Sequence, residues 1–418
     1  MKPDSDILIV GGGLSGLPLA LACAQGGLSV TVVDALDPAT ATDAKFDGRV
    51  SAIAFASCRM LAQLGVTQHL EGQMQPINDI MVSDGRVPSF SYSSRRSRGG
   101  GASPFFLHFD HKEIGNEPLG NLIENRHMRI ALQKAVADQP LIRLIAPQSV
   151  KRVEYGAQAV ATLGNGETVS ARLCFAADGR ASPVREAAGI KTVGWDYGQT
   201  GIVCTVEHEV PHEGVAQEYF LPGGPFAILP MVGNRASLVW TEKTEDAKAI
   251  LALSDEAFAD EMRARFGDYL GVCAPAGPRW SYPLTLQLAR DYVRPRLALI
   301  GDAAHGIHPI AGQGLNLGLR DVAAAAEVVV DAARLGLDIG ALDVLERYQR
   351  WRRFDNVALS LLMDGLNRLF SNDIGPVRLA RDLGLGLVNQ IGPARRFFMR
   401  HAGGVVGDLP RLLRGEAV

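Results

Sequence analysis

A glycine-rich segment near the N-terminus carries the first pattern that could do chemistry. It comprises Gly11, Gly12, Gly13, Leu14, Ser15 and Gly16 and fits G-x-G-x-x-G. Gly11 permits a tight turn, Gly13 lets the backbone approach a pyrophosphate, and Gly16 lets a helix pack closely on a sheet. Asp34 follows where a carboxylate can accept hydrogen bonds from a ribose. The pattern predicts a dinucleotide site but does not by itself separate NAD from FAD.

A second pattern lies far along the chain and starts after an apolar run. Its informative residues are Gly301, Asp302, Pro309, Gly312, Gly314, Leu315 and Asn316. Asp302 can accept from a ribityl hydroxyl. Backbone amides at the helix start near residues 312–316 can hold the pyrimidine edge of a flavin, which becomes anionic on reduction. His305 and His308 could be interpreted as metal ligands or as a catalytic pair. Their place in the turn between the apolar run and the following helix already explains their presence, so neither role is needed.

A third pattern, Asp178-Gly179, follows the apolar run 173–176. By itself an Asp-Gly turn is common and usually structural. Tyr219 precedes a run of apolar residues and prolines and is a candidate for polarising a phenol, although a packed aromatic is the simpler interpretation. The residues alone do not identify a general base.

The elements around these motifs follow from periodicity. Residues 7–10 and 28–33 read as strands, and residues 14–25 between them read as a helix, which gives a βαβ unit. We expect further helices over residues 51–64, 126–137, 255–266 and 315–335, and strands over residues 141–145, 203–209, 237–241 and 297–300. The pattern predicts an α/β (α+β) chain with a parallel sheet.

Composition limits the function classes. The chain has 418 residues, a net charge of -3 and 47% hydrophobic residues, which indicates a folded protein and no nucleic-acid binding. Five scattered cysteines predict reduced thiols in a cytoplasmic protein, and no metal-ligand spacing occurs. No signal peptide and no run of about 18 uncharged apolar residues is present.

With these motifs in this order, the sequence resembles the FAD-dependent aromatic hydroxylases of the p-hydroxybenzoate hydroxylase type. Residues 46–54, 109–115 and 119–126 are similar to the ubiquinone-biosynthesis branch of that family. The resemblance implies FAD as cofactor, with Arg49 contacting the FAD, Asn125 contacting its ribityl chain and Pro309 bordering the flavin ring. It also implies that Asp178 and Gly179 belong to the cofactor site.

The family fold implies three parts. A discontinuous Rossmann-like FAD domain covers residues 1–75, 111–185 and 281–345. An inserted mixed-sheet substrate domain covers residues 76–110 and 186–280. A C-terminal helical region covers residues 346–418.

The resemblance also implies the reaction. A reduced flavin and O2 form a C4a-hydroperoxyflavin, which hydroxylates the ring of a polyprenylphenol intermediate of ubiquinone biosynthesis. NAD(P)H or a separate reductase supplies the electrons. The alternatives are a hydroxylase of a small soluble phenol, a prenyl reductase of the same broad fold that works without oxygen, and a non-catalytic flavin-bound scaffold subunit.

Residues 350–418 contain 11 Arg against 6 Asp and Glu, with leucines at helical spacing. This tail is either a basic amphipathic surface or an apolar face packed on the body with solvated arginines. If the tail is a basic amphipathic surface, the protein is expected to lie peripherally on the inner face of the cell membrane, or against a ubiquinone-biosynthesis complex. This interpretation predicts that charge reversal at Arg395, Arg396 and Arg400 reduces liposome binding.

Overall fold

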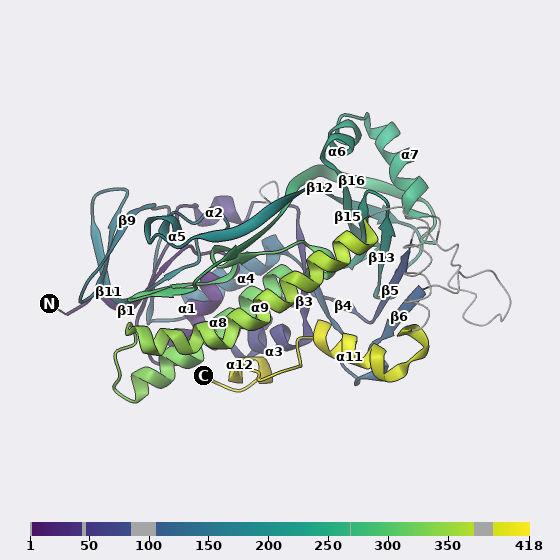
Figure 1. Cartoon of the computed structure of the whole chain (residues 1–418). Coiled ribbons are helices and arrows are strands. Elements are labelled where there is room, and N and C mark those ends of the chain that lie inside the picture. Colours follow the sequence, from purple (N-terminus) through teal and green to yellow (C-terminus); the bar gives the residue numbers. More distant parts are fainter. Residues whose placement is uncertain (1, 44–46, 85–105, 268, 372–387) are drawn as a thin grey trace.

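Three sheets organise the chain in the computed structural model, which describes residues 2–43, 47–84, 106–267, 269–371 and 388–418 (Figure 1). Two of these sheets have eight strands and the third has three. The first large sheet lies toward the N-terminus, and the second lies at the other end of the molecule. Long helices cover the first sheet and continue toward the second.

The first sheet has the order β17-β18-β11-β1-β2-β8, with β10 paired to β11 and β9 paired to β10. Its strands are β1 (Ser5–Val10), β2 (Val30–Val33), β8 (Ile142–Ile145), β9 (Val150–Tyr155), β10 (Ala159–Leu163), β11 (Thr168–Ala176), β17 (Val293–Arg294) and β18 (Leu297–Leu299). Strands β18, β11, β1, β2 and β8 run parallel. The turns that follow β1, β11 and β18 therefore meet at one edge, where α/β sheets bind ligands.

The second sheet is mixed and has the order β19-β16-β12-β15-β14-β13-β5-β6. Its strands are β5 (Asp79–Asp84), β6 (Phe106–Asp110), β12 (Thr192–His208), β13 (Val215–Leu221), β14 (Gly224–Met231), β15 (Arg235–Lys243), β16 (Cys273–Ala289) and β19 (His305–Gly306). Only the β13–β5 pair is parallel within the described strands. Between the large sheets lies the third, made of β3 (Val50–Ala54), β7 (Gly120–Glu124) and β4 (Gln75–Ile77).

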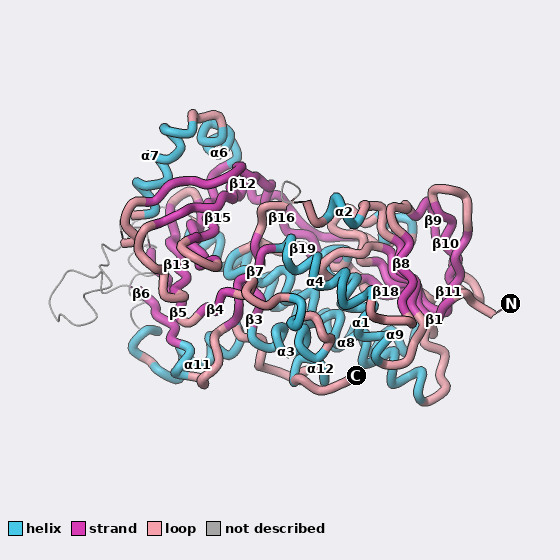
Figure 2. The backbone as a smooth tube through the Cα atoms, turned by 180° about the vertical axis from the view of Figure 1, so that it is seen from behind, coloured by secondary structure: helices cyan, strands magenta, loops and turns pink. Residues whose placement is uncertain are grey.

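Helices pack on both large sheets (Figure 2). They are α1 (Gly16–Gln25), α2 (Pro38–Ala41), α3 (Phe55–Gln63), α4 (Asn125–Ala137), α5 (Pro183–Ala187), α6 (Thr244–Leu251), α7 (Asp255–Phe266), α8 (Gln313–Arg334), α9 (Leu342–Phe370), α11 (Gly392–Ala402) and α12 (Arg411–Arg414). Helix α8 packs on α1 and α9, and its alanine-rich middle is fully buried. Helices α6 and α7 cover the second sheet, where Trp240, Phe258 and Phe266 form a separate core.

The predicted α/β (α+β) fold with a parallel sheet and a mixed second sheet is confirmed. The division into FAD, substrate and C-terminal regions stays a prediction. Strands β5 and β6 pair with the strands formed after residue 190, which supports an insertion made in pieces. Residues 85–105, inside the predicted segment 76–110, lie outside the described residues.

One predicted helix starts in the wrong place. Residues 51–54 were expected to begin a helix, but they belong to β3, which pairs antiparallel with β7, and α3 begins at Phe55. The run Ser-Ala-Ile-Ala suits either state, and pairing with a distant strand decides it.

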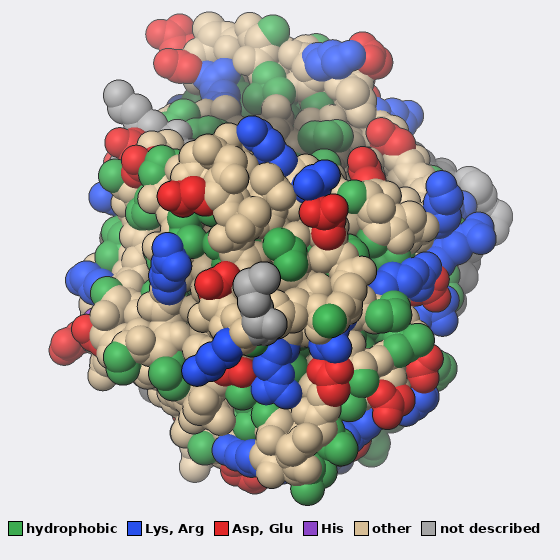
Figure 3. Space-filling view, turned by 90° about the vertical axis from the view of Figure 1, so that its left-hand side faces the viewer, with side chains coloured by type: hydrophobic (Ala, Val, Ile, Leu, Met, Phe, Trp, Pro, Cys, Tyr) green, Lys and Arg blue, Asp and Glu red, His purple; other side chains and the backbone are tan. Residues whose placement is uncertain are grey.

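The surface of the molecule carries charged side chains of both signs (Figure 3). On the face near the N-terminus, acidic and basic side chains are interspersed (Figure 3). In the described part of the chain, no helix is both long enough and apolar enough to cross a membrane.

Candidate active site

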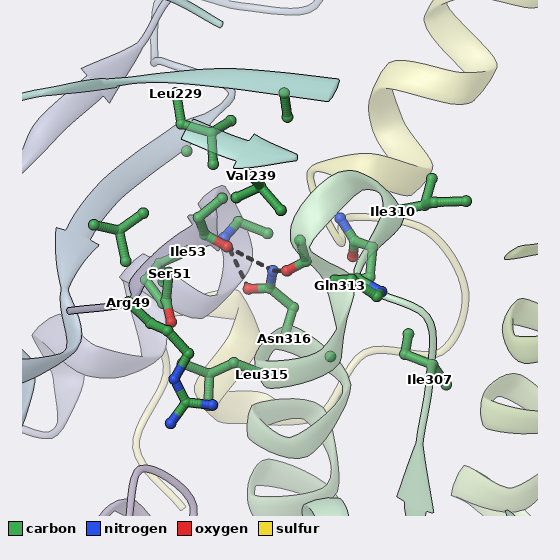
Figure 4. Close-up of a pocket in the computed structure, with 18 of the residues that line it drawn as sticks. Arg49, Ser51, Ile53, Leu229, Val239, Ile307, Ile310, Gln313, Leu315 and Asn316 are labelled. Atoms are coloured by element: carbon green, nitrogen blue, oxygen red, sulfur yellow. Dashed lines mark hydrogen bonds between the residues drawn. The ribbon is translucent and has the colours of Figure 1, made fainter. Parts of the chain in front are cut away.

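A cavity of about 560 Å³ lies where the edge of the first sheet, the start of α8 and the second sheet meet. Its walls come from the glycine turn after β1, from β3, from β13 to β15, from the segment before α8 and from α11. Leu229 and Val239 lie on the side of the cavity opposite Arg49 (Figure 4). The cavity thus joins a polar floor to an apolar roof, which is typical of small-molecule sites.

The glycine turn after β1 sits tightly against the turn after β11. Gly11 has φ +103°, and a Cβ there would lie 2.3 Å from the carbonyl oxygen of Ala177, so no larger residue fits. The Gly12 N–H donates to Asp34 Oδ2 at 2.8 Å, and the Leu36 N–H donates to Asp34 Oδ1 at 2.9 Å. These bonds fix the carboxylate and leave each oxygen with a free lone pair.

A smaller cavity continues from the first along this turn. It is lined by Gly12, Gly13, Asp34 and Leu36, and by Arg129 from α4. Gly13 and Arg129 line both cavities. The two cavities therefore form one extended site that runs from the second sheet to the end of β2.

Arg49 is held at the floor of the main cavity by a buried acid. Its Nε and Nη2 donate to Asp47 at 2.8 and 2.9 Å, and its guanidinium lies 4.9 Å from the centre of the Tyr282 ring. Burial alone would raise the pKa of Asp47, but the hydrogen bonds and charge of Arg49 outweigh it and lower that pKa to about 2. Asn125 also lines the cavity and joins this group through Ser51, at 2.6 Å, and Asp47.

The start of α8 forms part of the cavity wall. Gly312 caps the helix with φ +61°, and Gln313, Gly314 and Leu315 line the wall. Because the first amides of a helix lack internal partners, this end favours an anionic group. Pro309 and the carboxylate of Asp302 also line the cavity.

The side chain of Asn316 bonds to the backbone of the protein itself, whereas the sequence pattern predicted a ligand role for the backbone amides of this segment. Its Oδ1 accepts from the Ala54 N–H at 2.8 Å, and its Nδ2 donates to the carbonyl oxygens of Ala52 at 2.8 Å and Gly312 at 3.2 Å (Figure 4). Asn316 therefore ties α8 to β3. Only its backbone remains to serve a ligand.

Two residues singled out in the sequence lie away from the cavity wall. Asp178 lines neither cavity, and its Oδ2 accepts from the Val184 N–H at 3.2 Å, at the start of α5. Tyr219 is buried in the core of the second sheet, where it stacks with Phe226. Its hydroxyl donates to Gln217, which does line the cavity.

Other lining residues escaped the sequence analysis. Arg129 lies four residues after Asn125 on α4, so helical spacing could have placed both on one face. Arg180 lines the cavity and donates to Thr285 Oγ1 at 2.8 Å. Met399 and Ala402 of α11 reach the cavity from the far end of the chain, and no local signal marks them.

His308 is buried behind the cavity wall, edge-on to the ring of Tyr197 at 5.1 Å. Among the described residues, no group of three or more His, Cys, Asp or Glu could hold a metal ion. Burial lowers the pKa of His308 to about 4, against the smaller opposing effect of Asp364.

This pKa gives a pH dependence of stability. The unfolded chain takes up the His308 proton near pH 6.5 and the folded protein only near pH 4, so the free energy of unfolding falls as the pH drops through that window. We expect His308→Leu to flatten this part of the profile, measured by urea unfolding at several pH values. Equal slopes for variant and wild type would refute this assignment.

The described residues fit FAD. The extended pair of cavities offers a glycine turn for a pyrophosphate, an acid at the end of β2 for a ribose, and the α8 start for a reduced isoalloxazine. The fold and this site define an FAD-dependent oxidoreductase. The chain belongs to the FAD binding domain family, whose model matches residues 4–350. FAD is therefore the cofactor, as expected.

Similar proteins with assigned activities cover nearly the whole chain. It is 51% identical to "Ubiquinone hydroxylase UbiL" of Rhodospirillum rubrum, over 98% of this chain and 93% of that protein. It is 34% identical to the "3-demethoxyubiquinol 3-hydroxylase" of Escherichia coli, over 96% of this chain and 99% of that protein.

A solved structure shares the fold. The p-nitrophenol 4-monooxygenase PnpA from Pseudomonas putida superposes with a TM-score of 0.78, covering 97% of this chain and 99% of that one. At 17% sequence identity, this similarity is evidence for the fold alone.

Proposed function

We propose that this protein is an FAD-dependent monooxygenase that hydroxylates the aromatic ring of a polyprenylated phenol in ubiquinone biosynthesis. The similarity to two ubiquinone-pathway hydroxylases along the whole chain carries this proposal. The cavity supports it, because apolar side chains roof the space beyond the flavin site. Bound FAD would supply the activation of O2.

The chain's own residues have separable roles in this proposal. Gly13, Leu14, Ser15 and Asp34 would hold the dinucleotide half, in a turn whose close backbone contacts require Gly11 and Gly16. Arg49, Asn125, Arg129 and Asp302 would hold the middle of the FAD. The amides in the first turn of α8 would bind the pyrimidine edge and stabilise its negative charge after reduction. Pro309 and the second sheet exclude water and orient the phenol ring.

The charges on the second-sheet side of the cavity favour a neutral phenol over a small aromatic acid. Among the described residues, the second sheet contributes Glu218 but no Lys or Arg to the wall. A carboxylate substrate would lack a cation there, whereas a neutral ring with an apolar tail would not need one. Among the described residues of this sheet, Gln217 and Thr241 are the uncharged polar side chains in the wall that could contact ring oxygens.

The proposal includes two further contacts. The electron donor is NAD(P)H, acting directly or through a separate reductase. A lipid-tailed substrate also calls for peripheral contact with the inner face of the cell membrane or with a ubiquinone-biosynthesis complex, because the tail is far more stable in a bilayer than in water.

The test is a lipid extract of a deletion strain, analysed by liquid chromatography and mass spectrometry. The strain is complemented with wild type or with Asp302→Ala. We expect ubiquinone to fall and an under-hydroxylated prenylphenol to accumulate in the deletion strain. Wild type should restore ubiquinone and Asp302→Ala should restore less than about a tenth of it, since the variant loses a flavin contact made by a charged group.

The mass and fragmentation of the accumulated precursor identify the ring carbon. Unchanged ubiquinone in a strain without a redundant hydroxylase would refute the pathway assignment. Full rescue by Asp302→Ala would instead favour the scaffold alternative, in which the flavin site is dispensable.

A further inference from the structure

Helix α11 has two faces with different surroundings. On its inner face, Met399 is 1% exposed and lines the cavity, and Ala402 lines it one turn later. On its outer face, Phe397 and Phe398 are 57% and 42% exposed. One helix thus separates the candidate active site from solvent with aromatic side chains directed outward.

Contacts at both ends fix α11 in this position. Arg395 forms an ion pair with Glu113 at 2.9 Å, and the Asn389 side chain accepts from the His108 N–H at 3.0 Å. Beyond its C-terminus, the carbonyl oxygen of Gly403 accepts from the Ala56 N–H at 3.1 Å. The orientation of the outer face is therefore set by β6, by the turn after β6 and by α3.

The outer face is basic as well as apolar. Arg396 and Arg400 are exposed and form no ion pair with any described residue. Most other arginines of the tail have acidic partners; for example, Arg411 contacts Glu327 and Asp331. The unpaired positive charge near α11 thus lies beside the exposed aromatic rings.

We propose that α11 docks the protein on an anionic lipid bilayer and that the tail of the lipid substrate leaves the cavity beside Met399 and Ala402 into that bilayer. Basic side chains next to exposed aromatics on one helix face are the composition that binds anionic membrane surfaces. Ala402 is both exposed and part of the cavity wall, so the cavity reaches the surface at the docking face. The tail route rests on the proposed function, whereas the docking does not.

The docking test uses purified FAD-loaded protein and vesicles of phosphatidylcholine with or without phosphatidylglycerol. We expect wild type to co-sediment with the anionic vesicles and to be released by salt. Phe397→Ser/Phe398→Ser should weaken binding about tenfold or more. Arg396→Glu/Arg400→Glu should weaken it at least about thirtyfold, given an attraction of about 1 kcal/mol between each arginine and an anionic surface. Arg395 is left intact because its reversal would break the pair with Glu113.

Two controls make comparable changes at the other end of the molecule. Leu335→Ser removes a side chain that is 72% exposed at the end of α8, and Arg143→Glu/Lys151→Glu reverses two exposed charges on β8 and β9. Both should bind vesicles like wild type. Failure of wild type to bind, as expected if the face docks a protein instead, or equal loss in the controls, would overturn the docking.

The tail route has its own readout. Met399→Trp narrows the cavity beside α11, so we expect the kcat/KM for a long-chain prenylphenol to fall about tenfold relative to that for a short-chain analogue, with FAD content unchanged. An unchanged ratio would overturn the route. Docking is scored without substrate, and short-chain hydroxylation is scored without vesicles. A failure of the proposed function therefore leaves the docking result readable.

Discussion

Replacing Asp321 with asparagine is expected to lower the free energy of unfolding by about 3–5 kcal/mol, because it removes the buried carboxylate that pairs with the buried guanidinium of Arg352. Asp321 is fully buried on α8. It accepts from Arg352 Nε at 3.0 Å and from Asn356 Nδ2 at 3.0 Å, both on α9, and pairs with His305 at 2.5 Å. Urea unfolding followed by circular dichroism measures the loss.

The same substitution should reach the flavin site. Asp321 Oδ2 also accepts from the Gly301 N–H at 3.2 Å, and the next residue, Asp302, lines the cavity. We therefore expect the dissociation constant for FAD to rise at least about tenfold, measured by flavin fluorescence under conditions where the variant is folded, because the lost bond is about one hydrogen bond to a charged group.

Asp355→Asn is the matched control. Asp355 contacts Arg352 Nη1 at 2.9 Å, but its side chain is 41% exposed. Removing its charge should cost under about 1 kcal/mol, as for other solvent-exposed ion pairs. An equal loss in both variants would contradict the claim that burial sets the difference.

Replacing Asn316 with alanine is expected to cost about 3 kcal/mol of unfolding free energy even without FAD. Three backbone groups, at Ala52, Ala54 and Gly312, would lose their partner, and each unpaired buried group costs about 1–3 kcal/mol. The loss occurs in the apoprotein because the side chain serves the fold. Thermal and urea unfolding of apoprotein and FAD-loaded protein measure it.

Asn316→Asp separates the donor from the acceptor. The carboxylate still accepts from Ala54 but cannot donate to Ala52 and Gly312, so we expect a loss at least as large as with alanine. Asn121→Ala, which removes an amide that donates to the Cys58 sulfur at 3.4 Å, should cost much less. If Asn316→Ala weakened FAD binding yet left apoprotein stability unchanged, its side chain would be a flavin contact after all.

Local patterns predicted the part of the site that is built from consecutive residues. The G-x-G-x-x-G turn with Asp34 lies as expected, because strand, turn and helix are adjacent in the chain and glycine alone fits the close contact between Gly11 and Ala177. The same reasoning misplaced residues 51–54, whose state depends on the partner strand β7.

The sequence by itself determined the FAD motifs, the resemblance to aromatic hydroxylases and the parallel sheet. Each of these features depends on residue types at short, fixed spacings along the chain. Only the tertiary structure decided which polar groups serve the fold and which face the cavity. Residues 350–418 contain an excess of arginine over acidic residues, yet Arg352 is buried against Asp321 and Arg395 is paired with Glu113. Pairing and burial join residues far apart in the chain, so no local pattern encodes them.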